Sequence, residues 1–336
     1  MASTPATPSF STLLQKFFVD YLGHQRAVSP STVAAYRDTF RMMLAFAEKT
    51  IGKSPTDLTL ADVNATLILG FLDHLEKERN NSIRSRNARL AAIRSFLKYA
   101  AHHDLTSLAT IEQTLAIPTK RYDKRLLGFL TRPEMEAIID ASNPQTWVGQ
   151  RDRAFFSMLY NTGARVSEII NLRVEDVVLD VSPAAHLHGK GRKRRSVPLW
   201  KATATTVRRW TARLPKAREA DLLFPSRSGA RLSRSNVAQR LAVSVSQATA
   251  AHPQLAGRTI SPHTIRHTTA MHLLQSGVDI AVIALWLGHE SPTTTHMYLE
   301  ADLAMKEHAL SRLQPVEVTS ARYRPPDQLL AFLQSL

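Results

Sequence analysis

Four short segments of the 336-residue sequence carry polar side chains of the types that suit the cleavage of a phosphate ester. Guanidinium groups bind phosphate oxygens in bidentate fashion, imidazole and amine groups move protons, and a phenolic hydroxyl can act as a nucleophile. Singly these residues are weak signals, because a lone histidine or tyrosine is usually structural. The segments contain, in chain order, Arg165 with Glu168, Lys190 between two glycines, His263 with Arg266, and His289 followed by Tyr298.

The order and spacing of these residues resemble the signature of the tyrosine recombinase family, the phage-integrase type of site-specific recombinase that includes the Xer and Cre proteins. That signature has an Arg in a Thr-Gly-x-Arg-x-x-Glu turn, a Lys in a hairpin, a His-x-x-Arg pair, a Leu-Gly-His, and a Tyr nine residues later. Here Tyr298 lies nine residues beyond His289. The resemblance extends over residues from about 9 to 312, and residues 82–99 are similar to the family's core-binding domain.

The resemblance implies a role for each of these residues. Arg165 and Arg266 grip the non-bridging oxygens of the scissile phosphodiester, where negative charge develops. A spacing of three residues presents His263 on the same helical face as Arg266. Tyr298 attacks the phosphorus and makes a 3′-phosphotyrosyl link, which keeps the bond energy for rejoining. By the same resemblance the reaction needs no metal, ATP or other cofactor.

Proton transfer falls to the remaining polar residues. Lys190 is the candidate general acid for the leaving 5′-oxygen, and Lys193 is an alternative because the register of a turn shifts easily. His263 and His289 handle the tyrosine proton or hydrogen-bond a phosphate oxygen. Glu168 orients the first arginine of the set, or a neighbouring group, without touching the substrate.

Two competing interpretations use some of the same residues. His263 and His267 stand four apart, as zinc ligands on a helix do, but Arg266 between them has no use in a metalloprotease, so we expect no metal site. Tyr323 is the downstream rival of Tyr298. We interpret Tyr323 as a surface or packing residue, because it lies beyond the matched region.

The hydrophobic pattern predicts a mostly α fold with two domains. Residues 1–110 are expected to form a helical core-binding (SAM-like) DNA-binding domain, and the polar, proline-interrupted residues 111–127 a linker. Residues 128–312 are expected to form an α+β catalytic domain with a small antiparallel sheet. Residues 313–336 form a tail that ends in a short apolar helix, which docks on a partner subunit or packs on its own domain.

Two helices stand out in the first domain. Ser29 and Pro30 are an N-cap and first-turn pair. A second helix, at residues 82–100, places Leu90, Ile93, Leu97 and Ala100 on one stripe. Its other faces carry basic side chains without intervening acids, so we expect them to contact DNA. These are Arg84, Arg86, Arg89, Arg94 and Lys98.

The second domain is predicted to combine several helices with one hairpin. Thr131 and Glu134 form a capping box that opens a helix. Further helices are expected near 150–160, 199–213, 234–249, 262–275 and 279–287. Residues 184–199 read as two short strands joined by a glycine-flanked basic turn. We expect four consecutive cations of this hairpin to bind DNA, namely Arg192, Lys193, Arg194 and Arg195.

The charge balance indicates a polyanionic partner. Lys and Arg number 43 against 28 Asp and Glu, giving a net charge of +15. Residues 181–218 hold eleven Lys or Arg and no acid, so double-stranded DNA is the expected partner. The chain has no cysteine, which excludes disulfides and thiolate catalysis. Without a signal-like start or an apolar run of about 18 residues, we expect a bacterial cytoplasmic, nucleoid-associated protein with no membrane partner.

The family resemblance also implies an assembly. We expect a homo-tetramer on two DNA sites, or a hetero-tetramer with a related recombinase, exchanging strands through a Holliday junction. Two other functions remain open. A type IB topoisomerase uses a similar residue set without synapsis, and a non-catalytic DNA-binding factor would keep only the fold. The sequence does not distinguish a chromosome-dimer resolvase, a phage integrase and a transposon recombinase, and it does not define the target DNA.

Overall fold

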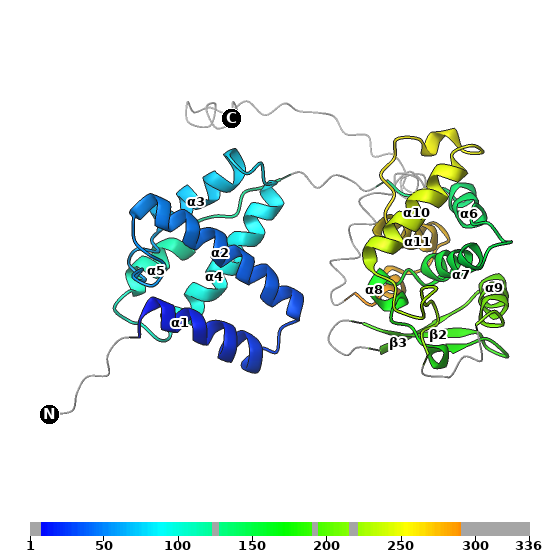
Figure 1. Cartoon of the computed structure of the whole chain (residues 1–336), viewed down its shortest axis with the longest axis horizontal. Coiled ribbons are helices and arrows are strands. Elements are labelled where there is room, and N and C mark those ends of the chain that lie inside the picture. The colour runs from blue at the N-terminus through cyan, green and yellow to red at the C-terminus, as the bar shows by residue number, and fades with distance from the viewer. Residues whose placement is uncertain (1–7, 123–127, 190–193, 215–220, 290–336) are drawn as a thin grey trace, which may run out of the picture. The chain divides into compact units, whose positions relative to one another are not determined.

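The chain divides into two compact units, Met1–Arg125 and Leu126–Leu336. This computed structural model describes residues 8–122, 128–189, 194–214 and 221–289 (Figure 1). Most described residues are helical, and the strands are confined to the second unit, as the mostly α prediction required.

The first unit is a bundle of helices that begin where the sequence offers a cap. Ser29 accepts a hydrogen bond from the backbone N–H of Thr32, and Pro30 follows at the first helical position. Ser82 caps the basic helix predicted at residues 82–100 in the same way, because its side chain accepts a hydrogen bond from the backbone N–H of Ser85. The elements are α1 (Phe10–Lys16), the π-helical turn η1 (Phe17–Gln25), α2 (Pro30–Ile51), α3 (Ala65–Lys77), α4 (Ile83–Ala101) and α5 (Leu108–Leu115).

An aromatic cluster lies at the centre of the first unit. Phe17, Phe40 and Phe96 are buried and contact one another edge to face, with ring centroids 5.4–6.4 Å apart. The predicted stripe of α4 packs into this core. Its four members are buried, namely Leu90, Ile93, Leu97 and Ala100.

The five basic side chains of α4 do not form one exposed face. Arg86 is buried, so its predicted contact with DNA is wrong, whereas Arg89 and Arg94 are half-buried. Arg86 is 3% exposed, and its Nε lies 3.2 Å from Glu76 Oε1. Arg89 donates from Nη1 to the Ala35 carbonyl oxygen at 2.9 Å, which ties α4 to α2. Arg94 donates to the carbonyl oxygens of Leu115 and Ile117. Arg84 and Lys98 are exposed, as expected.

The segment that leaves the first unit is shorter than the predicted linker. Residues 111–115 are the second half of α5, and Ile111 and Ile117 belong to the hydrophobic core. The next residues are held against α4, because Asn87 exchanges two hydrogen bonds with the backbone of Lys120 and Arg86 donates to the Pro118 carbonyl. The chain is therefore fixed to the first unit as far as residue 120.

The second unit is built around the helix at Trp147–Thr162, against which other helices pack, and it also contains a sheet. Thr131 and Glu134 form the predicted capping box of its first helix. The helices are α6 (Arg132–Asp140), α7 (Trp147–Thr162), α8 (Val166–Ile169), α9 (Lys201–Thr211), α10 (Arg234–Ala248), α11 (Pro262–Gln275) and α12 (Ile280–Leu287), with 3-10 turns η2 (Val174–Asp176) and η4 (Pro253–Leu255).

The predicted hairpin is part of a three-stranded antiparallel sheet. Strand β2 (Ala184–His188) pairs with β3 (Arg194–Pro198), with Ala185 opposite Val197. The two-residue strand β1 (Val177–Val178), which the sequence pattern did not predict, pairs with the other edge of β2. Ala185, Leu187 and Val197 face the core, which α7 and α9 cover (Figure 1).

The entry into the second unit is fixed as firmly as the exit from the first. Leu130 donates from its backbone N–H to Thr268 Oγ1 of α11 at 3.0 Å. Arg258 donates to the Phe129 carbonyl and pairs with Glu134, both at 2.9 Å. The residues just after the boundary are therefore bound to the helix that carries His263 and Arg266.

The Arg86–Glu76 pair generates a stability prediction. Replacing Glu76 with Gln leaves the Arg86 charge buried without a carboxylate, so we expect the free energy of unfolding to fall by about 3 kcal/mol in urea denaturation. The control is Asp73→Asn on the same helix, whose partner Lys77 is exposed and whose loss should cost below about 0.5 kcal/mol. Equal losses in both variants would contradict the structural role of the buried pair.

Candidate active site

Arg165 lies at the start of α8, immediately after a sharp turn. The turn is Gly163, which ends α7 with φ of +58°, a conformation that glycine adopts without strain. The Arg165 side chain is 35% exposed. Its Nη1 donates to Glu168 Oε1 at 3.1 Å, and its Nη2 approaches the Gly288 carbonyl oxygen at 3.4 Å.

Arg266 joins three segments that are far apart in the sequence. Its side chain is buried, with Nη1 donating to the Gly163 carbonyl at 2.7 Å and Nη2 to the Leu287 carbonyl at 2.8 Å. Those carbonyls belong to the ends of α7 and α12, while Arg266 itself is on α11. Because two main-chain groups fix it, the guanidinium is held in one orientation before any substrate binds.

His289 follows the left-handed Gly288 that ends α12. Burial, together with the charges of Arg266, Arg165 and Arg195, lowers the pKa of His289 from 6.5 to about 4. At neutral pH its imidazole is therefore uncharged.

Glu168 is the carboxylate between two arginines. Burial opposes its ionisation most strongly, but hydrogen bonds and charge from Arg195, and then from Arg165, lower its pKa below the ordinary value. Arg195 donates from Nη1 and Nη2 to the two carboxylate oxygens at 3.2 and 2.8 Å. The prediction that Arg195 is an exposed DNA contact is wrong, since its side chain is 12% exposed and points into the unit.

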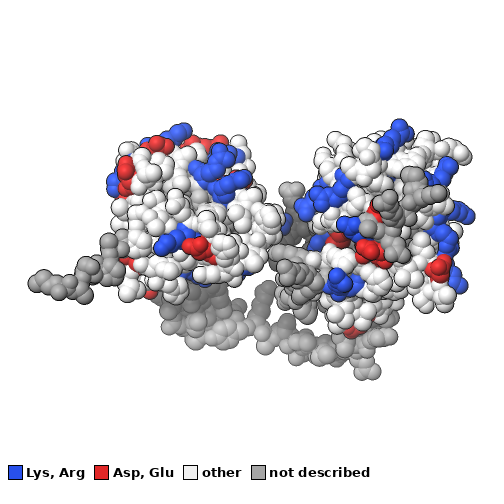
Figure 2. All heavy atoms as spheres, turned by 60° about the horizontal axis from the view of Figure 1, so that its bottom comes forward, with Lys and Arg blue, Asp and Glu red and all other residues white. Residues whose placement is uncertain are grey.

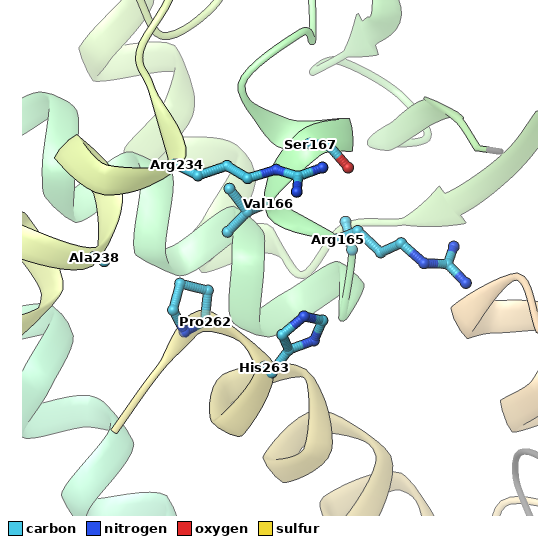
Figure 3. A pocket seen from close by; sticks show the side chains of 8 residues that line it. Arg165, Val166, Ser167, Arg234, Ala238, Pro262 and His263 are labelled. Carbon is cyan, nitrogen blue, oxygen red and sulfur yellow. The ribbon is translucent and has the colours of Figure 1, made fainter. Parts of the chain in front are cut away.

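A pocket of about 240 Å³ opens beside Arg165 and His263 (Figure 3). In the close-up the His263 ring points toward the segment of Arg165 and Val166, and the side chain of Arg234 extends from α10 toward Ser167. Sequence reasoning missed Arg234. The sequence predicted a helix that begins near residue 234. No local sequence pattern indicates that this helix lies beside α8.

The remaining predicted site residues divide into two groups. Arg194 is exposed on β3, beside the inward-pointing Arg195. Lys190, Arg192, Lys193 and Tyr298 lie outside the described residues.

The first unit carries a basic groove that the α4 pattern did not predict. It has a volume of about 570 Å³ and is lined from α2 by Arg41 and Lys49, and from further along the chain by Arg79 and Arg89. Asp38 is the acidic residue lining it. Figure 2 shows Lys and Arg side chains gathered in patches on both units.

Within the part of the chain that the structure describes, no three His, Asp or Glu side chains are grouped as metal ligands. Among the same residues, no helix is both long and apolar enough to cross a membrane.

A helical unit is followed by an α+β unit in which two arginines and two histidines converge, an arrangement that suits the binding of a phosphate ester. The model of the phage integrase family matches residues 128–305, and that of the phage integrase N-terminal SAM-like domain matches residues 16–104. The chain belongs to the phage integrase family and is a tyrosine-type site-specific recombinase. The SAM-like match disfavours the topoisomerase alternative.

Individual relatives agree with this assignment. The chain is 47% identical to the "Putative integrase/recombinase y4rC" of Sinorhizobium fredii, covering 98% of both chains. It is 30% identical to the tyrosine recombinase XerD of Pseudomonas putida, over 84% of this chain and 90% of that one. Its fold is similar to that of the Tn1549 transposon integrase in complex with a circular intermediate DNA, with a TM-score of 0.68 and 17% identity, covering 90% of this chain and 99% of that one.

The Gly163 turn generates a second stability prediction. A Cβ at this position would lie 2.5 Å from Leu287 Cδ2, and the positive φ adds strain, so Gly163→Ala should lower the unfolding free energy by roughly 3 kcal/mol. Gly257 also has a positive φ, +71°, but a Cβ there meets nothing within 4 Å. Gly257→Ala should therefore cost only about 1 kcal/mol. If chemical denaturation gave the two variants the same stability, the close approach of α12 to the turn would be refuted.

Proposed function

We propose that Tyr298 is the nucleophile of this recombinase and that Arg165 and Arg266 bind the scissile phosphate. The observation that carries the proposal is the convergence of Arg165, His263, Arg266 and His289 from separate segments. Tyr298 follows His289 by nine residues, the spacing of the family signature. Each guanidinium has fixed partners in the protein, which orients it for developing phosphate charge.

The proposed cleavage step exchanges one bond at phosphorus for another. The Tyr298 oxygen forms a bond to phosphorus while the bond from phosphorus to the 5′-oxygen breaks, which gives the 3′-phosphotyrosyl intermediate. The phenolic proton passes to one neutral histidine, His289 or His263, and the other histidine hydrogen-bonds a phosphate oxygen. Lys190 donates a proton to the leaving 5′-oxygen. Rejoining reverses each transfer, with the 5′-hydroxyl of the partner strand as nucleophile, and no step requires a cofactor.

Both units are proposed to bind the duplex through exposed cations. In the first unit these cations are Arg84 and Lys98, together with Arg41 and Lys49 in the basic groove. Their exposure and the volume of the groove support this proposal. In the second unit the hairpin cations Arg192, Lys193 and Arg194 serve the same purpose. The net charge of +15 supports an affinity that falls steeply with salt.

Strand exchange is proposed to occur in a tetramer on two DNA sites, formed by four copies or with a related recombinase. Family membership supports the proposal, because exchange of two duplexes requires four cleavages. The tail at 313–336, which lies outside the described residues, is the proposed docking segment. The bacterial relatives support action on DNA in the bacterial cytoplasm, at the nucleoid or a mobile element.

The nucleophile is tested with a DNA duplex whose binding site has been selected from a random pool by the purified protein. Nicks placed near the cleavage position trap the covalent intermediate, because the short strand fragment diffuses away. We expect a covalent protein–DNA band in EDTA that is lost in Tyr298→Phe. The control is Tyr323→Phe, which should retain the band. Cleavage that needs a metal ion and leaves free ends would overturn the proposal.

The guanidinium clamp is tested by Arg165→Lys. Lysine keeps the positive charge but cannot form a bidentate bond to phosphate, so we expect the single-turnover cleavage rate to fall at least about 100-fold. The Kd for the selected duplex, measured by fluorescence anisotropy, should change little because many other cations hold the DNA. A variant that cleaves at the wild-type rate would show that bidentate binding is not required.

A further inference from the structure

Arg195 occupies a position that a DNA-binding residue would not. It uses three donors within the protein, with Nε bonded to the Trp286 carbonyl at 2.9 Å and both Nη atoms bonded to Glu168. It therefore joins strand β3, helix α8 and the last turn of α12. Two of these segments, α8 and the end of α12, fix the positions of Arg165 and His289.

The turn before His289 is packed directly against this guanidinium. Gly288 has a φ of +67°, and a Cβ at that position would lie 2.8 Å from Arg195 Nη1. The carbonyl of the same glycine accepts the weak hydrogen bond from Arg165. Arg195 thus contacts one face of a turn whose carbonyl faces the proposed clamp.

Glu168 is bound by two arginines, and Arg195 supplies more of the hydrogen bonds from their guanidinium groups. The Glu168 side chain is 2% exposed, so its charge requires partners within the protein. Arg195 binds both carboxylate oxygens through its guanidinium. The Arg165 guanidinium contacts Oε1 only, and the Arg165 backbone N–H donates to Oε2 at 2.8 Å. Without Arg195, the buried carboxylate would draw Arg165 into a bidentate pair of its own, in competition with the DNA phosphate.

We propose that Arg195 is a positioning residue for DNA cleavage, which satisfies Glu168 so that Arg165 stays available to the scissile phosphate and which holds the turn before His289. This inference rests on the proposed function, because it assigns Arg195 a role in the reaction at that site. Arg195 does not touch the DNA in this account. It acts through Glu168 and through the Trp286–Gly288 turn.

The first test separates cleavage from binding with the nicked, selected duplex described above. Arg195→Gln should reduce the single-turnover cleavage rate at saturating protein by about 10- to 100-fold, the effect usual for a residue that orients a catalytic group. The Kd for the intact duplex should stay within about threefold of wild type. The matched control is Arg153→Gln, which removes a surface arginine paired with Asp140 and should change neither quantity.

A second test asks whether Arg195 acts through Glu168. Glutamine at position 168 carries no charge to attract Arg165, so Arg195→Gln should cost much less in a Glu168→Gln background than in wild type. Independent, multiplying effects of the two substitutions would overturn the proposal.

A third readout does not depend on activity. The Arg195 charge contributes to the lowered pKa of His289, so Arg195→Gln should raise that pKa above about 4 in an NMR titration of the free protein. Comparison with a His289→Gln variant assigns the signal. An unchanged pKa would show that Arg195 does not influence His289 and would overturn the proposal.

Arg195→Lys covers the case in which the glutamine variant does not fold. Lysine retains a cation near Glu168 but cannot bridge both oxygens and the Trp286 carbonyl, so we expect a folded protein with normal Kd and slow cleavage. Wild-type cleavage, or a loss of binding with no loss of rate at saturation, would each overturn the proposal. Absence of a Tyr298-dependent covalent complex in the wild-type protein would instead refute the proposed function itself.

Discussion

The catalytic unit depends on holding several positive charges together before DNA arrives. Arg165, Arg195 and Arg266 all act on the pKa of His289, so they lie within electrostatic range of one imidazole. Their mutual repulsion is offset by the buried carboxylate of Glu168 and by four main-chain carbonyls at the ends of α7 and α12. A phosphate that enters this arrangement meets oriented donors, and little reorganisation remains to be done during the reaction.

The same network explains why short helices and glycine turns surround the site. Helix termini leave carbonyl groups without partners, and arginines that bind those groups satisfy the helix and fix their own side chains at once. Gly163 and Gly288 end α7 and α12 in the left-handed conformation, which turns the carbonyls of Gly163 and Leu287 toward Arg266. The backbone is therefore as much a part of the site as the side chains are.

The sequence predicted the features that depend on local residue spacing. It did not predict which basic side chains of a helix or strand point into the core. The mostly helical fold and the hairpin were predictable because caps and periodicity are local, and the family was predictable from the spacing of the signature residues. Arg195 was misassigned within a basic run, although strand alternation places it on the same face as the buried Val197. Arg86 likewise stands one turn before Leu90 on the buried stripe of α4. Counting charges could not show which of them point inward. The pairing of β1 with β2 and the groove around Arg41 depend on tertiary contacts, which no local sequence pattern encodes.

The bonds that fix the chain at Lys120 and again at Leu130 set the length of the tether between the two units. Ten residue steps separate these points, so they can never be more than about 36 Å apart. In the proposed complex, a duplex held by one unit would meet the other unit at an effective concentration in the millimolar range. Two binding surfaces joined in this way act with an avidity that exceeds the affinity of either surface.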